Sequence, residues 1–432
     1  MKLFLIFLPL FIFSCSADKD KKVDLEIFKK QGEKINVFET NNVFDKEVDS
    51  RIILQLNQPQ INKKWSYEHF SSNNFYDHLV YEGKFQDIFK KNIGDYINKN
   101  NDSGSLLVSE NFVFFSDEKG KIYKFDTNGQ KIIWELKIYE SSYNNYPKNI
   151  ALFLNDDVLF AADNLGFIYS IDVQTGKTIW QHNYGIPFSS HLNFHKGVLY
   201  VVNQNSRLYA FNPLDGQKIW SFESLSGLIK PSRSSNISLH DNKLLFSNDI
   251  GDITAIDLNQ QVITWTKNIL SQNSISNNLV FKISNILIDK KDVFVSSNSG
   301  DLFNFNLETG EIKWSQKLSS IQNHISTDKY LFVLTENGFV IAFNKTNGAI
   351  LWSLNLAKLS KDKKVSPDYY GLLLASNNLY VTSSNGDIYK ISANDGKYIT
   401  HKKINNDLSR APIIVDNKIL ILNRSSELII FN

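Results

Sequence analysis

The sequence predicts an all-β protein: an eight-bladed β-propeller of four-stranded antiparallel blades, closed by pairing of N- and C-terminal strands. Three observations predict this fold. A seven-residue strand phrase recurs eight times, a tryptophan follows most copies at a fixed distance, and the last copy lacks residues for the final strand of its unit. A four-stranded unit repeated about every 40 residues is typical of propellers.

The strand phrase has its clearest copy in "GFIYSID", Gly166 to Asp172. Its third position is always Ile, Leu or Val, and its sixth is always Phe or Ile. Apolar residues therefore occur at positions of both parities, which predicts a strand buried on both faces. The other copies begin at Gly120, Ser206, Gly251, Gly300, Gly338, Gly386 and Ser426.

A tight turn and a second strand follow each copy, as in "IDVQTGKTIW". The carboxylate of Asp172 can accept a hydrogen bond from the turn backbone, and Gly176 can adopt the positive φ that closes the turn. Glycine recurs at that offset as Gly216, Gly310, Gly348 and Gly396, whereas Gln261 stands there in another copy. Eight residues after the seventh position stand Trp134, Trp180, Trp220, Trp265, Trp314 and Trp352, with Thr400 in the next copy.

The two ends of the chain are predicted to meet. Another hairpin precedes each copy, which completes a four-stranded unit, but the last copy stops at Asn432. Trp65 in "INKKW" has no copy of its own. We therefore expect Trp65 to provide the missing outer strand and, like the other six tryptophans, to dock one blade on the next. Closure removes exposed sheet edges.

The composition indicates a folded, nearly neutral protein. Hydrophobic residues make up 42% of the chain, and 47 Lys and Arg stand against 45 Asp and Glu. The chain can bury a large core, and its charge gives no reason to expect nucleic acid as a partner.

The N-terminus has the pattern of an export signal. Residues 1–14 contain Lys2 and an apolar run too short to span a bilayer as a mature helix. The tetrad "IFSC" ends at Cys15, the only cysteine, and resembles the lipobox of bacterial lipoproteins. We therefore predict a signal peptide over residues 1–14, a tether lipidated at Cys15 over residues 15–60, and the propeller over residues 61–432. By resemblance, Ser16 after the Cys favours the periplasmic face of the outer membrane.

The pattern Asp-x-x-x-Gly-Lys-x-x-Trp at Asp172 to Trp180 is similar to the docking motif of the pyrroloquinoline quinone (PQQ) propeller family. In that family the tryptophan is structural. A lipoprotein with eight blades and no further domain resembles the BamB family within it, as does the lead-in "GEKINVF". The resemblance implies a noncatalytic scaffold that docks on the POTRA domains of the subunit inserting β-barrels into the outer membrane.

Partner-binding residues are expected where the repeat is interrupted. The longest interruptions are Phe75 to Ser105, Ser221 to Ser238 and Thr266 to Ser284. The second lies where BamB proteins carry a partner-binding loop, and the resemblance points to Leu228, Lys230 and Arg233 as an apolar anchor with two cationic donors. Solvated loops are the alternative. Blade edges could also take unfolded outer-membrane proteins by strand addition.

An enzyme is the main alternative function. The PQQ dehydrogenases of this fold are known for a vicinal Cys pair and a Ca²⁺ held by oxygen ligands. Only Cys15 exists here, and no cluster of acidic residues breaks the repeat. We therefore predict no cofactor, no metal site and no catalytic residue, while a dehydrogenase, a degenerate quinone binder and a cell-surface binder remain alternatives.

Overall fold

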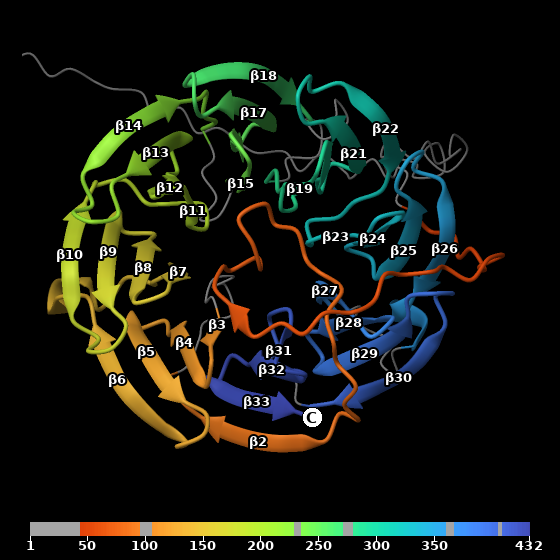
Figure 1. The fold of residues 1–432 in the computed structure, drawn as a ribbon, viewed down its shortest axis with the longest axis horizontal. Coiled ribbons are helices and arrows are strands. Elements are labelled where there is room, and N and C mark those ends of the chain that lie inside the picture. The colour runs from red at the N-terminus through yellow and green to blue at the C-terminus, as the bar shows by residue number, and fades with distance from the viewer. Residues whose placement is uncertain (1–43, 96–105, 229–234, 271–279, 360–366, 405–407) are drawn as a thin grey trace, which may run out of the picture. The chain divides into compact units, whose positions relative to one another are not determined.

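The computed structural model describes residues 44–95, 106–228, 235–270, 280–359, 367–404 and 408–432. In this part of the chain, eight antiparallel sheets follow one another around a ring in sequence order (Figure 1). The predicted eight-bladed propeller is thus confirmed. Apart from strands, the described residues contain two short 3₁₀ turns, η2 (Ser141–Tyr143) and η4 (Leu356–Leu359).

The first four blades run from the inner to the outer strand in chain order. Blade 1 consists of β3 (Leu107–Ser109), β4 (Phe112–Ser116), β5 (Lys121–Asp126) and β6 (Lys131–Lys137). Blade 2 consists of β7 (Ile150–Asn155), β8 (Val158–Asp163), β9 (Phe167–Asp172) and β10 (Thr178–Asn183). Blade 3 consists of β11 (Asn193–His195), β12 (Val198–Val202), β13 (Arg207–Phe211) and β14 (Lys218–Glu223). Blade 4 consists of β15 (Ile237–His240), β16 (Lys243–Ser247), β17 (Asp252–Asp257) and β18 (Val262–Asn268).

The next three blades repeat this order, and the eighth differs in its outer strand. Blade 5 consists of β19 (Leu287–Asp289), β20 (Asp292–Ser296), β21 (Asp301–Asn306) and β22 (Ile312–Lys317). Blade 6 consists of β23 (Ile325–Ser326), β24 (Tyr330–Leu334), β25 (Phe339–Asn344) and β26 (Ile350–Asn355). Blade 7 consists of β27 (Tyr369–Ala375), β28 (Asn378–Ser383), β29 (Asp387–Ser392) and β30 (Tyr398–Lys403). Blade 8 consists of β31 (Ile413–Val415), β32 (Lys418–Leu422), β33 (Glu427–Phe431) and the N-terminal β2 (Asp87–Asn92).

The hydrophobic core lies between neighbouring blades. One buried cluster joins Phe160 and Ile168 of blade 2 to Leu199 and Val201 of blade 3, and similar clusters join blades 3 and 4, 4 and 5, and 5 and 6. A strand between two such clusters needs apolar side chains on both faces, which explains the apolar character of the repeated phrase.

Strand pairing between the two ends of the chain closes the ring, as predicted, but the closing strand is β2. Asp87 pairs with Phe431, and Asn92 pairs with Glu427 (Figure 1). The prediction that Trp65 supplies this strand is wrong. Trp65 lies in β1 (Lys64–Trp65), which pairs with β3 and adds a fifth strand to the inner edge of blade 1.

Phe89 of β2 occupies the position that tryptophan holds in other blades. Trp180 pairs with Ser170 directly after a one-residue irregularity, and Phe89 pairs with Ile430 after the same irregularity. A bulge of this kind increases the local twist of the outer strand. The Phe89 ring packs on Phe125 of the next blade, with ring centroids 5.9 Å apart. The spacing of tryptophans does not reveal this strand, because its aromatic residue is a phenylalanine.

Tryptophans of the outer strands dock on the turn of the following blade. The indole of Trp314 donates a hydrogen bond from Nε1 to the carbonyl of Lys345 (2.8 Å), and its ring covers Gly348. A Cβ at Gly348 would lie 2.6 Å from that ring, so only glycine allows this contact. The same arrangement is found for Trp134 with Gly176, Trp180 with Gly216, Trp265 with Gly310, and Trp352 with Gly396.

Besides blade 8, with its Phe89, two blades depart from this docking. Trp220 packs on Tyr200 at 5.9 Å, and the turn that follows it in the ring carries Gln261, with φ +56°, instead of glycine. Blade 7 has Thr400 in its outer strand, where most other blades have tryptophan. Phe85 from the segment before β2 occupies the space that the tryptophan ring would fill. Phe85 is 8% exposed and packs on Tyr380 with ring centroids 5.7 Å apart.

A segment that we call the plug, residues 62–79, crosses the centre of the ring (Figure 1). Its backbone and amide side chains bond to the inner strands near their hairpin turns. The amide of Asn74, 1% exposed, donates to the carbonyls of Ile237 (3.1 Å) and Ile286 (2.9 Å) on blades 4 and 5. Further bonds join the plug to blades 8, 2, 3 and 7, through Asn62 with Asp416, Ser66 with Leu154, Ser72 with Asn193, and Leu79 with Leu374. The plug therefore replaces solvent for inner-strand groups that would otherwise lack partners.

Candidate functional site

The loop after β14 connects blades 3 and 4 and contains the predicted partner-binding residues. Its first residues are fixed by the neighbouring turn: Gly227 N donates to Asp249 Oδ1 (2.9 Å), and Asn248 Nδ2 donates to Leu225 O (3.1 Å). Leu225 and Leu228 are 74% and 101% exposed. Two large apolar side chains thus project from an anchored loop.

Only one of the three predicted partner-binding residues lies in the described part of the chain. Leu228 lies at the end of the described part of this loop and is fully exposed. Lys230 and Arg233 lie outside the described residues, as does Cys15, the predicted lipidation site. The structure therefore gives a geometry for Leu228 alone.

The central channel contains a cavity of about 610 Å³ between the plug and the blade-connecting loops. Its lining includes Trp65 and Tyr76 of the plug, Tyr369 of an inner strand, and Glu336 and Arg424 of turns. Burial raises the pKa of the Tyr369 hydroxyl. Sequence reasoning missed the cavity because its residues come from separate blades and share no local motif.

The cavity does not fit the Ca²⁺ and quinone chemistry of the PQQ dehydrogenases. In the described parts of the chain, no three His, Cys, Asp or Glu side chains gather closely enough to hold a metal ion. The carboxylates that line the cavity, Glu68, Glu336 and Asp368, belong to three separate segments. The vicinal cysteine pair is also missing from the sequence.

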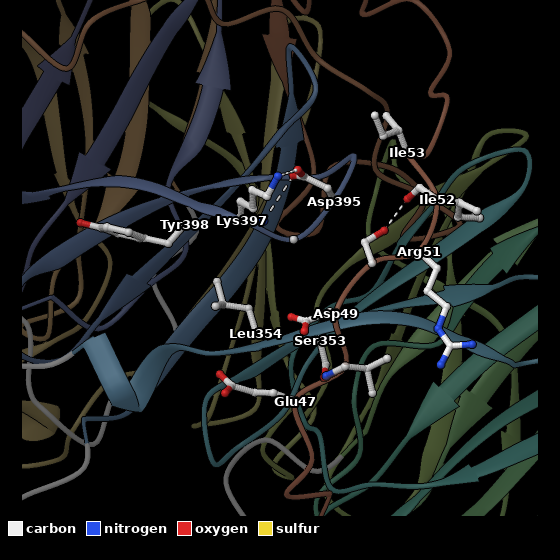
Figure 2. A pocket seen from close by; sticks show the side chains of 13 residues that line it. Glu47, Asp49, Arg51, Ile52, Ile53, Ser353, Leu354, Asp395, Lys397 and Tyr398 are labelled. Atoms are coloured by element: carbon white, nitrogen blue, oxygen red, sulfur yellow. Dashed lines mark hydrogen bonds and ion pairs between the residues drawn. The ribbon is translucent and has the colours of Figure 1, made fainter.

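A second pocket, of about 680 Å³, lies where residues 46–53 cross the outer strands of blades 6 and 7 (Figure 2). Ser353 of β26 donates from its backbone N to Val48 O (2.9 Å), and its Oγ donates to Lys46 O (2.7 Å). Glu47 accepts from Asn355 N (3.0 Å), and a hydrogen bond from Lys358 lowers the pKa of the Glu47 carboxyl. We call residues 46–48 the clip.

The described part of the predicted tether contacts the propeller. Val48 forms an antiparallel bridge with Ser353, and Leu54 is 1% exposed. Leu54 N also donates to the carbonyl of Asn394 on blade 7 (2.9 Å). These residues pack against the propeller because the edge of β26 offers unpaired backbone groups.

Side chains around the second pocket are of mixed character. Figure 2 shows Asp395 and Lys397 paired at one side (2.9 Å) and Ile52 and Ile53 at the other. Ile53 is 76% exposed. We see no arrangement of catalytic groups here.

No helix in the described residues has the length and apolar character needed to cross a bilayer.

Comparison with known proteins agrees with this geometry. A family model described as outer membrane protein assembly factor BamB matches residues 118–354 and 336–432. The solved structure of BamB from Moraxella catarrhalis has a TM-score of 0.65 at 13% identity, covering 80% of this chain and 99% of that one. A comparison with curated protein sequences finds no match.

Dehydrogenases share the same fold. A europium-containing methanol dehydrogenase has a TM-score of 0.67 at 12% identity, covering 83% of this chain and 89% of that one. The quinohemoprotein alcohol dehydrogenase from Comamonas testosteroni has a TM-score of 0.65 at 11% identity, covering 85% of this chain and 80% of that one. Likeness at this identity establishes the fold and leaves the activity open.

The fold and its docking motif define the chain as a PQQ-like β-propeller. More narrowly, because the family model spans most of the ring, the chain belongs to the family of the outer membrane protein assembly factor BamB.

Proposed function

We propose that this protein is a noncatalytic scaffold lipoprotein that assists the assembly of β-barrel proteins into the outer membrane. It docks on the POTRA domains of the barrel-inserting subunit. The carrying observation is the family match, together with an anchored loop that exposes Leu225 and Leu228. Exposed apolar side chains on a fixed backbone are typical anchors of protein interfaces, because little conformational entropy is lost when they bind.

The docking proposal can be tested by affinity pull-down from detergent-solubilised envelopes. The native protein should recover the POTRA-containing subunit, and Leu228→Glu should reduce recovery by about tenfold or more, because a carboxylate is costly to bury at an interface. Leu214→Glu is the matched control. Leu214 is 83% exposed in the hairpin turn between β13 and β14, away from the loop. Equal loss in both variants, or no recovery by the native protein, would contradict the proposal.

The membrane attachment is proposed to depend on Cys15. Several acyl chains at this residue would hold the protein at the periplasmic face of the outer membrane. Cys15→Ser should move the protein from the membrane fraction to the soluble fraction of the periplasm. Retention of the variant in the membrane would contradict lipid anchoring, and digestion by protease added to intact cells would contradict the periplasmic location.

Unfolded outer-membrane proteins are proposed as a second partner. The bridge between Val48 and Ser353 supports this proposal, because it is an example of an extended segment pairing with an outer strand. Cross-linking of a stalled barrel substrate to cysteines placed in β14 or β18 would test it. No cross-link to any outer strand would count against this partner.

The enzyme alternative has its own test. Saturable binding of PQQ and Ca²⁺ accompanied by dye-linked alcohol oxidation would replace the scaffold proposal, because a scaffold needs neither. In the described residues, the carboxylates that line the cavity do not form a group able to hold a metal ion, which argues against this outcome.

A further inference from the structure

The clip covers a place on the outer edge of β26 that is exposed in the other blades. Ser353, in the middle of β26, is 8% exposed. The same place, directly after the tryptophan or the residue that replaces it, is exposed in each of the other seven outer strands: Glu135, Gln181, Ser221, Thr266, Ser315, His401 and Lys90. An extended segment of the chain has therefore added itself to one particular outer strand.

β26 is also poorly protected by charge. Its sequence, ILWSLN, contains no Lys, Arg, Asp or Glu, and among the eight outer strands only β10, TIWQHN, shares this property. β26 is the more apolar of the two, because it carries Ile350, Leu351 and Leu354 where β10 has Ile179 alone. Charged side chains prevent unwanted pairing at exposed edges, so β26 is the edge most able to accept another strand.

The clip holds this edge through few backbone bonds. Val48 and Ser353 form an isolated bridge, in which Ser353 N donates to Val48 O (2.9 Å). The other contacts depend on side chains: Val48 N donates to Ser353 Oγ (2.8 Å), and Asn355 N donates to the Glu47 carboxylate (3.0 Å). A strand that followed β26 along its whole length could form more main-chain bonds than the clip does.

The second pocket adjoins the edge where the clip leaves it. Ser353 and Leu354 of β26 line this pocket together with Ile52, Ile53 and Tyr398 (Figure 2). Ile52 and Ile53 are 54% and 76% exposed. An extended peptide could enter at this end of β26 and bury apolar side chains against these groups while it replaces the clip.

We propose that the edge of β26 binds an extended, uncharged peptide with alternating apolar side chains, and that the clip is its displaceable internal occupant. Strands of β-barrel membrane proteins alternate apolar and polar residues, so an unfolded barrel protein has this chemistry. The inference rests on the proposal that unfolded outer-membrane proteins bind the propeller. It adds which strand they join and which segment controls their access.

The clip sets the apparent affinity of this site. A peptide pairs only with molecules whose clip has left β26, so its apparent Kd equals the intrinsic Kd divided by the fraction of such molecules. Weakening the clip raises this fraction and leaves the backbone of the edge unchanged. Tighter peptide binding is therefore the expected result of a substitution that removes clip contacts.

The probe is a fluorescein-labelled peptide of roughly ten alternating valine and threonine residues, long enough to cover a typical strand. Its binding to the full chain in detergent is followed by fluorescence anisotropy. Glu47→Ala combined with Ser353→Ala removes the side-chain bonds of the clip and should tighten binding roughly fivefold or more. Ser315→Ala, at the matched position of β22, should leave the affinity unchanged.

Cross-linking locates the bound peptide. A benzophenone at the centre of the probe should label residues 350–355 in the Glu47→Ala, Ser353→Ala variant. Equal affinity for variant and native protein, with labels only on other outer strands, would overturn the role of β26 and leave the peptide partner standing. No binding to either protein would overturn both proposals.

Two controls test the mode of binding. A probe with proline in place of valine lacks half of its N–H donors and should bind at least roughly tenfold more weakly, because strand addition needs main-chain bonds. Equal binding of the two probes would contradict strand addition. A variant that forms dimers and excludes the probe would show that a second copy of the chain takes the edge, which would overturn the peptide proposal.

A milder variant protects the test against misfolding. If the double variant does not fold, Ser353→Ala alone replaces it, because it removes the bond from Val48 N and the bond to Lys46 O. This variant should tighten binding roughly twofold or more. Unchanged affinity in Ser353→Ala would then overturn the control of β26 by the clip.

Discussion

At the scale of single residues, the pairs of tryptophan and glycine carry the contact between blades. Gly348 adopts φ +71° and lies under the Trp314 ring, so its replacement brings two separate costs. A side chain strains the positive φ, and its Cβ forces the indole away from the turn. The two costs can be separated with Gly197, which has φ +76° and open space around it.

We predict that Gly348→Ala lowers the free energy of unfolding by about 2–4 kcal/mol. Gly197→Ala should lower it by only about 1 kcal/mol, because it pays for the backbone strain alone. Urea denaturation followed by tryptophan fluorescence measures both. Equal losses in the two variants would contradict a steric role of the glycine under the indole.

A buried histidine gives the protein a defined sensitivity to acid. His324 is 1% exposed, and burial lowers its pKa from the usual 6.5 to about 3. Its Nε2 lies 3.0 Å from Ser296 Oγ, while Nδ1 has no partner among the described residues. Protonation would therefore place a charged donor where no acceptor is available.

The sign of the pH effect follows from this pKa. Between pH 6.5 and 3 the unfolded state binds the proton and the folded state does not, so stability falls as the pH drops through this window. His324→Gln removes the titrating group and tests this prediction. Relative to its own value at pH 7.5, the variant should retain about 3 kcal/mol more stability at pH 4 than the native protein. Parallel pH profiles would show that another group is responsible.

At the scale of elements, the closing strand and the plug both come from the region before the first repeat. The interruption over residues 75–105 was noted in the sequence, yet it contains β2 without the tryptophan that marks other outer strands. Phe89 keeps the register and the ring contact, and Phe85 fills the space beside Thr400. A short strand with the sequence DIFKKN has too weak a pattern to be recognised alone.

Substitutions in β2 should separate docking from strand formation. Phe89→Ala should cost about 2 kcal/mol, because the half-buried ring packs on Phe125. Ile88→Ala, next to it in the same strand, should cost about 0.5 kcal/mol or less, because Ile88 is 50% exposed. Chemical denaturation provides the comparison. A larger loss in Ile88→Ala would contradict the assigned register.

The features that could be predicted from the sequence are those that repeat locally along the chain. The phrase, turn and tryptophan lie within about twenty residues of one another, so the blades were predictable from spacing. The plug bonds and the cavity join residues such as Asn74 and Ile286, which are distant in sequence and belong to no repeated pattern. Leu228 was named by resemblance, and its exposure became visible only in the structure.

At the scale of the whole molecule, closure covers the edge of β33, which blade 8 would otherwise expose. A chain that begins at Phe44 keeps the clip, the plug and β2, whereas a chain that begins at Ile93 loses all three. The second chain leaves β33 without its outer neighbour and the inner strands without the plug.

We predict that the chain beginning at Phe44 unfolds in one cooperative transition and is monomeric at micromolar concentration. The chain beginning at Ile93 should unfold at a lower urea concentration and should self-associate through the exposed edge of β33. Denaturation and light scattering after size-exclusion chromatography measure the two properties. The same midpoint and the same mass for both chains would contradict the closure.

The pairing of Asp87 with Phe431 also imposes an order in time. The two residues are roughly 340 positions apart, so during synthesis β2 emerges long before its partner exists. Contacts of such long range form slowly, and Phe89 and its neighbours remain exposed until the last strand arrives. We therefore expect ring completion to be the late step of folding, and a chain interrupted before β33 to remain a substrate for chaperones and proteases.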